Sequence, residues 1–164
     1  MTSASDQGPV GLLRRLACML YDGMLLVAVL FFASLLATIP FGITHEHPLF
    51  WLYTLYIWLV SFVYFGWFWT RGGQTLGMQA WRVRLERPDG AQVSWRQSLL
   101  RYMGGLVYWL LTGLALYAHR HGMPAATIVI AVVLALAVAW TLRHPQRWML
   151  QDLVSGTRLV RVPK

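Results

Sequence analysis

The chain contains 164 residues, of which 57% are apolar and only 12% are charged, and its formal net charge is +8. An ordinary soluble domain carries about 25% charged residues, so this composition argues strongly against a water-soluble globule. The 14 Lys and Arg residues lie beside long apolar runs instead of in a basic tail. We therefore expect anionic lipid headgroups as a partner, and no nucleic acid. The single cysteine, Cys18, excludes an intrachain disulfide and a Cys-based zinc site.

Four segments are free or nearly free of charged side chains, and they span residues 16–39, 49–70, 99–118 and 124–142. Each approaches or exceeds the about 20 residues that a helix needs to cross about 30 Å of hydrocarbon. The sequence therefore predicts an all-α membrane protein, with four transmembrane helices in one domain over residues 1–164. Pro40 is expected to stop the first helix, and Pro124 occupies a first helical turn that tolerates its missing donor.

A cleaved signal peptide is the alternative for the first apolar segment, because Arg14 and Arg15 give it a basic flank. The apolar run exceeds the usual about 7 to 15 residues, and no Ala-x-Ala cleavage site follows it. We therefore expect the segment to remain in the protein as a helix.

Basic residues are concentrated on one side of the predicted membrane. Of the 14 Lys and Arg residues, only Arg120 lies in one of the two outer loops, which join the first span to the second and the third to the fourth. Cytoplasmic segments of membrane proteins carry such an excess. We therefore expect the N terminus, the central loop 71–98 and the tail 143–164 to be cytoplasmic.

The central loop carries signs of structure of its own. Three glycines at its start lack the Lys and Ser/Thr of a phosphate-binding loop, since Met78 and Gln79 follow the last of them. A glycine-permitted turn into an interfacial helix is therefore favoured over nucleotide binding. Ser94 and Gln97 have the spacing of a capping box and predict that a helix begins there.

Two further elements are predicted on the cytoplasmic side. Residues 81–85 alternate apolar and basic side chains, a tight-turn dipeptide follows at Asp89 and Gly90, and an extended pattern resumes after it at residues 92–93. This order predicts a small hairpin. In the tail we expect a short interfacial helix over residues 148–154, and the pattern of residues 157–162 is compatible with one more strand.

Asp22 is the only acidic residue within an apolar span, about 9 Å below the cytoplasmic edge at about 1.5 Å per residue. An ionised carboxylate facing lipid costs about 2.5 to 3.5 kcal/mol, so we expect Asp22 to face other helices or water. Arg15 lies on the same helical face but about 10 Å away along the axis, which makes Arg101 the better expected partner. A protonatable Asp22 would act as a proton or cation relay, whereas a permanently paired one would be a packing device.

Two pairs of histidines lie in the outer loops, and they are His45, His47, His119 and His121. Together with Glu46 they could ligate a divalent metal such as zinc, although Arg120 opposes this. Solvated loop histidines are the favoured interpretation, so we expect no metal and no cofactor. Because no Ser-His-Asp, Cys-His or paired-carboxylate arrangement is present, we expect no enzymatic activity.

Several motifs together resemble one family. They are Arg15, Asp22, the run Gly73-Gln74-Thr75-Leu76-Gly77 with Trp81-Arg82-Val83 after it, and the run Gln151-Asp152-Leu153-Val154-Ser155-Gly156-Thr157. This combination resembles the RDD family of bacterial membrane proteins, named after one arginine and two aspartates. By the motif these three residues fall on Arg15, Asp22 and Asp152, with Arg14 as the alternative register for the arginine. Arg101 is similar to an arginine that recurs ahead of a later helix in the family.

The resemblance covers about residues 11 to 162 and implies a multi-pass module of the bacterial cytoplasmic membrane. It also implies transport of small ligands, with cation/proton exchange attributed to some members. Our leading hypothesis is therefore an ion or small-solute transporter in which Asp22 exchanges a proton or cation, Arg15 or Arg101 tunes its pKa, and Asp152 orders the cytoplasmic mouth. Because four helices leave little room for a path within one chain, we expect a homo-oligomer. The alternative is a non-transporting scaffold or assembly factor in which the same four residues fix helix packing.

Overall fold

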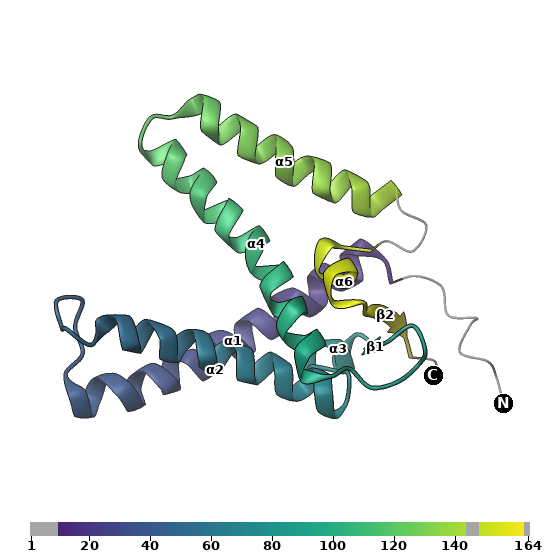
Figure 1. The fold of residues 1–164 in the computed structure, drawn as a ribbon, viewed down its shortest axis with the longest axis horizontal. Helices are drawn as coiled ribbons and strands as arrows, with labels where there is room; N and C mark the ends of the chain where they lie inside the picture. The colour runs from purple at the N-terminus through teal and green to yellow at the C-terminus, as the bar shows by residue number, and fades with distance from the viewer. Residues whose placement is uncertain (1–9, 144–147, 163–164) are drawn as a thin grey trace.

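The computed structural model describes residues 10–143 and 148–162. Within them the chain forms six helices and two short strands: α1 (Leu12–Phe41), α2 (Phe50–Arg71), α3 (Leu76–Ala80), β1 (Val83–Glu86), α4 (Trp95–Arg120), α5 (Pro124–Arg143), α6 (Leu150–Ser155) and β2 (Arg158–Arg161). Figure 1 shows two long helical hairpins, α1–α2 and α4–α5, which diverge from a cluster of the short elements.

Four helices, α1, α2, α4 and α5, are long and apolar enough to cross a membrane, which confirms the four predicted spans. Most of their large apolar side chains are exposed: 73% of Leu36 and 75% of Trp109, for example, are open to the surroundings. Such surfaces are stable against hydrocarbon and not against water. The protein is therefore a mostly helical membrane protein.

The ends of the long helices follow local chemistry. Ser94 and Gln97 form the predicted capping box, in which the Gln97 N–H donates to Ser94 Oγ at 3.3 Å and the Ser94 N–H donates to Gln97 Oε1 at 3.1 Å. Pro40, which we expected to stop α1, lies inside its last turn instead. The helix ends at Phe41, and the left-handed conformation of the next residue, Gly42, lets its N–H donate to the Thr38 carbonyl at 2.8 Å.

The small sheet joins segments that are far apart in the sequence. β1 pairs with β2 in antiparallel register, with Val83 opposite Arg161. Our expected local partner, residues 92–93, is not a strand. The Asp89–Gly90 turn does form, but only residues 91 to 93 separate it from the helix cap at Ser94, too few to pair with a four-residue strand. The segment that we considered only as an additional strand, 157–162, supplies the partner instead.

The buried core lies at the end of the helices where the short elements gather, and it consists of Val10, Cys18, Trp69, Met78, Val83, Leu85, Val93, Tyr102 and Leu159. Arg15, Arg71, Arg101 and Arg143 all lie toward this end of the four spans. We call it the basic end. The two hairpins are thus packed against each other at the basic end, while their outer loops lie apart (Figure 1).

A buried Arg–Asp–Arg cluster and a second aspartate site

The carboxylate of Asp152 joins the two hairpins. Asp152 lies in the first turn of α6, and its Oδ2 accepts a hydrogen bond from Arg15 Nη1 of α1 at 2.6 Å. Its Oδ1 accepts one from Arg101 Nη1 of α4, also at 2.6 Å. At most 2% of each of these three side chains is exposed. The cluster is therefore a fully desolvated ion network, with two positive charges around one negative charge.

The charge state of Asp152 is set by opposing effects. Burial by itself would raise the pKa of its carboxyl group. The positive charges of Arg101 and Arg15 and the N–H of Met149, which donates to Oδ2 at 3.0 Å, oppose burial and hold the pKa below its ordinary value. Asp152 is therefore ionised at neutral pH, and both of its oxygens are engaged.

The Arg101 side of the cluster extends into α6 and the residues after it. Arg101 Nη1 also donates to Thr157 Oγ1 at 3.0 Å, and Thr157 Oγ1 lies 2.7 Å from Ser155 Oγ. The guanidinium carbon of Arg101 lies 5.4 Å from the centre of the Trp69 ring. This network ties the residues around α6 to both α4 and α2.

Close helix packing permits this arrangement. A Cβ on Gly104 of α4 would lie 2.9 Å from the Cα of Gln151, the residue before Asp152. Any side chain at position 104 would therefore push α6 away from α4, and Asp152 would lose its contact with Arg101.

Asp22 forms a separate site next to the cluster. Its Oδ2 accepts a hydrogen bond from Thr75 Oγ1 at 2.5 Å, and its Oδ1 accepts one from the Gly77 N–H at 2.8 Å. Thr75 is the N-cap of α3, and its Oγ1 in turn accepts from the Met78 N–H at 3.2 Å. Asp22 therefore holds the first turn of α3 against α1.

The expected pairing of Asp22 with Arg101 is wrong, and Arg15 does not pair with Asp22 either. Both arginines bind Asp152, and Asp22 has no ion pair within the described part of the chain. The reason is geometric: α6 brings a carboxylate to the level of the two arginines, while Asp22 lies two helical turns deeper than Arg15. The alternative register at Arg14 is also decided, since Arg15 is buried and in contact with Asp152.

Sequence reasoning named the four charged residues but missed their neutral partners. Thr75, Gly77 and Thr157 all lie inside the two motif runs that carried the family resemblance. The signal was present as a motif, yet the pairing could not be read from it because the partners lie 53 to 56 positions apart in the chain.

The four histidines of the outer loops are not brought together. His47 Nδ1 accepts from the Leu49 N–H in the loop before α2, and the His121 ring packs on Tyr117 at the end of α4. Among residues 10–143 and 148–162, no group of three or more His, Cys, Asp or Glu side chains is close enough to hold a metal ion. The outer loops therefore provide no support for a metal site.

One known family covers the residues of both sites. The RDD family model matches residues 9–156, which include Arg15, Asp22, Arg101 and Asp152. The chain belongs to the RDD family. Comparison with curated proteins and with solved structures gave no significant match. In this RDD protein the arginine and the second aspartate of the motif contact each other, and the first aspartate holds α3 separately.

Proposed function

We propose that this RDD protein is a membrane scaffold or assembly factor, in which the cluster of Arg15, Asp152 and Arg101 holds the two hairpins in one fixed arrangement. The supporting observation is that a single carboxylate on α6 contacts both hairpins and is completely buried. Breaking a buried ion pair on one side leaves an uncompensated charge and costs about 3 to 5 kcal/mol. Such a contact is suited to two hairpins whose relative position is fixed. It is poorly suited to hairpins that would have to separate in every transport cycle.

A full-length chain cut at one position tests whether Asp152 holds the two hairpins together. The turn at Asp89–Gly90 is exposed, so a protease site placed there can be cut after purification, separating α1–β1 from α4–β2. We expect the two parts to co-elute in mild detergent, and Asp152→Asn to release them. Asp22→Asn is the matched control, because it breaks a buried carboxylate contact that lies within one part. If the two parts stay together equally well in both variants, Asp152 does not hold the two hairpins together.

Cross-linking in native membranes tests the assembly role. A scaffold should give a cross-linked product that contains a second protein, and Asp152→Asn should lower its yield while Asp89→Asn leaves it unchanged. Asp89 is a suitable control because it forms an exposed ion pair with Arg87. Products that are all multiples of this chain would instead indicate a homo-oligomer with no assembly partner.

Ion or small-solute transport, including cation/proton exchange, is the second candidate function, and one observation favours it. Asp22 is buried within α1, yet its two hydrogen-bond donors, Thr75 Oγ1 and the Gly77 N–H, are both neutral. Its negative charge is therefore not balanced by an ion pair in the described residues, and a proton or a monovalent cation could balance it.

Flux measurement distinguishes the two functions. Proton and monovalent-cation flux is measured in proteoliposomes for the natural sequence, Asp22→Asn and the exposed control Asp89→Asn at matched incorporation. The scaffold predicts no flux above empty vesicles in any of them. Flux that is lost only in Asp22→Asn would establish exchange through this aspartate and contradict a purely structural role.

The location of the protein, its association with other copies and its lack of enzymatic activity are part of the same proposal. We place the basic end in the cytoplasm of a bacterial cell, with the helices in its cytoplasmic membrane and anionic headgroups around the arginines. We further propose that several copies associate through the exposed apolar helix faces, and that the protein catalyses no reaction.

A further inference from the structure

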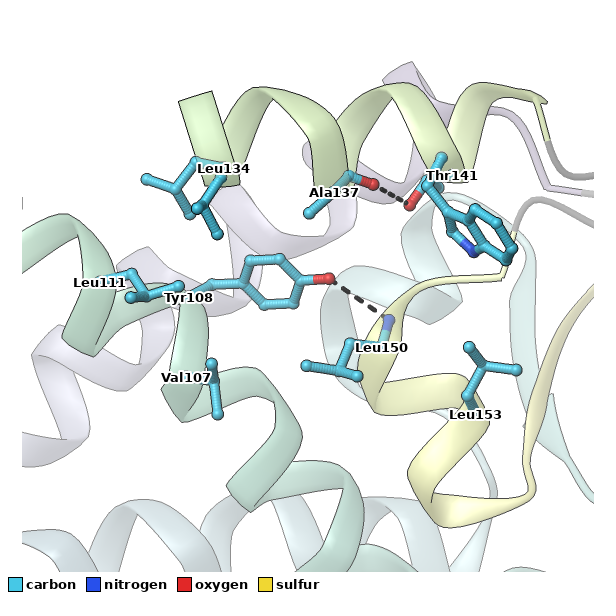
Figure 2. A pocket seen from close by; sticks show the side chains of 10 residues that line it. Val107, Tyr108, Leu111, Leu134, Ala137, Thr141, Leu150 and Leu153 are labelled. Atoms are coloured by element: carbon cyan, nitrogen blue, oxygen red, sulfur yellow. Dashed lines mark hydrogen bonds between the residues drawn. The ribbon is translucent and has the colours of Figure 1, made fainter. Parts of the chain in front are cut away.

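An apolar groove lies between α4 and α5 near the basic end. Its volume is about 290 Å³. The two helices diverge from their shared loop, and α6 lies across the wider end (Figure 1). The walls include Val107, Tyr108 and Leu111 of α4, Leu134 and Ala137 of α5, and Leu150 of α6 (Figure 2).

Two hydroxyl groups in the wall are already engaged within the protein. Tyr108 Oη accepts from the Leu150 N–H at 3.3 Å, and Thr141 Oγ1 donates to the Ala137 carbonyl at 3.0 Å (Figure 2). A buried water typically needs two to four polar partners. The groove therefore fits an apolar occupant and not a chain of water molecules.

The position of the groove indicates which kind of molecule can bind in it. It lies between two helices that can cross a membrane, so its surroundings are hydrocarbon. An acyl chain is narrow and flexible, so it can follow an apolar groove of about 290 Å³ between two helices. Arg143, the last residue of α5, does not line the groove, but its long, exposed side chain lies at the basic end of the helix that forms one wall. Its positive charge complements a phosphate at the headgroup level.

We propose that this groove binds one acyl chain of an anionic phospholipid, whose phosphate lies beside Arg143. The site goes beyond the scaffold role, because it makes the position of α5 depend on a lipid. The acyl chain fills the space between α4 and α5, and it contacts Leu150 and Leu153 of α6, which lie within one turn of Asp152. Lipid occupancy thereby supports the helix that joins the two hairpins.

Photo-crosslinking tests the site in the full-length protein. Proteoliposomes contain either phosphatidylglycerol or phosphatidylcholine with a diazirine in the middle of one acyl chain, and mass spectrometry maps the adducts. We expect adducts to concentrate on residues 107–111, 133–141 and 150–153. Ala137→Phe fills the groove and should lower their yield about tenfold, because the ring displaces at least two methylene groups. Ala135→Phe is the matched control, since Ala135 is exposed on α5 and does not line the groove.

The headgroup is tested separately. Arg143→Gln should lower the phosphatidylglycerol adducts about fivefold and the phosphatidylcholine adducts by less, because the choline group offsets the charge of the phosphate that both lipids carry. Adducts spread evenly over all four spans, or an equal loss in Ala135→Phe, would overturn the groove as a site. Equal labelling by the two lipids would overturn the anionic headgroup. If Ala137→Phe fails to fold, the adduct map of the natural sequence still decides between a specific groove and uniform lipid contact.

Discussion

At the scale of single residues, Asp152 has the most contacts to lose. It is bonded to two arginines and to the backbone N–H of Met149, and each of its oxygens accepts at least one hydrogen bond. Because the two arginine side chains are also buried, neither can turn to solvent if the carboxylate is removed. The cluster is therefore stable only as a complete set.

Asp152→Asn should lower the free energy of unfolding in detergent by about 3 to 5 kcal/mol at neutral pH, because it leaves two buried guanidinium charges without a counter-charge. The pKa of Asp152 is lowered in the folded protein, so its stabilising contribution is present above the unfolded value of about 3.9 and is lost as the pH falls through the folded value. Thermal unfolding should therefore separate the natural sequence from the variant at pH 5 to 7. The difference in unfolding temperature should start to narrow as the pH falls below about 4, and it should close only below the lowered pKa of the folded protein.

The exposed control Asp89→Asn should unfold at the same temperature as the natural sequence at neutral pH, since its ion pair with Arg87 is open to solvent. A difference between the natural sequence and Asp152→Asn that persists unchanged to pH 3 would mean that the ionised carboxylate is not what stabilises the cluster.

The sequence showed which charged residues matter, and it did not show how they pair. The cost of a carboxylate in hydrocarbon singled out Asp22, and the motif added Arg15, Arg101 and Asp152. Pairing depends on where α6 lies relative to α1 and α4, and a short helix of six residues carries no periodic pattern that fixes its position. A search for a cationic partner therefore overlooked the neutral donors Thr75 and Gly77, which Asp22 uses.

At the scale of elements, α3 is held in place by close contact with α1. It contains only five residues, too few to be stable by itself, and its first turn lies directly against α1. Gly77 permits this approach, because a Cβ there would lie 2.7 Å from the Cys18 carbonyl oxygen and 2.8 Å from Asp22 Cγ. The glycine and the aspartate thus act together to fix the position of α3.

Gly77→Ala should destabilise the protein by about 1 to 3 kcal/mol, because the added methyl group forces α3 away from α1. The movement can be detected at Cys18, which is 3% exposed and packs in the same core as Met78 of α3. We expect maleimide to label Cys18 faster in this variant than in the natural sequence. Gly113→Ala is the matched control, because nothing lies within 4 Å of its Cβ position. Equal labelling rates in the two variants would contradict the close contact.

Elements of different length were predictable to different degrees. Long apolar segments and the capping box at Ser94 depend on local sequence, and all of them appear as expected. The partner of β1 depends on the fold, since Val83 and Leu85 are buried in a core that also contains the distant Leu159, the residue opposite Leu85 in the sheet. Local turn chemistry at Asp89 and Gly90 was correct, but a turn alone does not decide which strand completes a sheet.

At the scale of the whole molecule, the two hairpins have one region in common. The ion network, the sheet and the buried core all lie at the basic end, whereas the outer loops lie apart (Figure 1). The long apolar surfaces of the four spans are exposed and are suited to contact with hydrocarbon. Because both hairpins leave from the same end, we predict that both outer loops lie on one side of the membrane and the basic end on the other, with the distribution of basic residues setting which side is cytoplasmic.

This orientation can be measured with single cysteines, since Cys18 is buried and gives little background labelling. Ala91 lies in the exposed loop at the basic end, and Glu46 and Met123 lie in the two outer loops. A membrane-impermeant maleimide should label Glu46→Cys and Met123→Cys in intact bacterial cells, and Ala91→Cys only in inverted vesicles. The physical reason is that, of the 14 Lys and Arg residues in the sequence, only Arg120 falls in or beside an outer loop. Labelling of the two outer loops from opposite sides would mean that the hairpins do not share one orientation, and a joint at Asp152 could not then form.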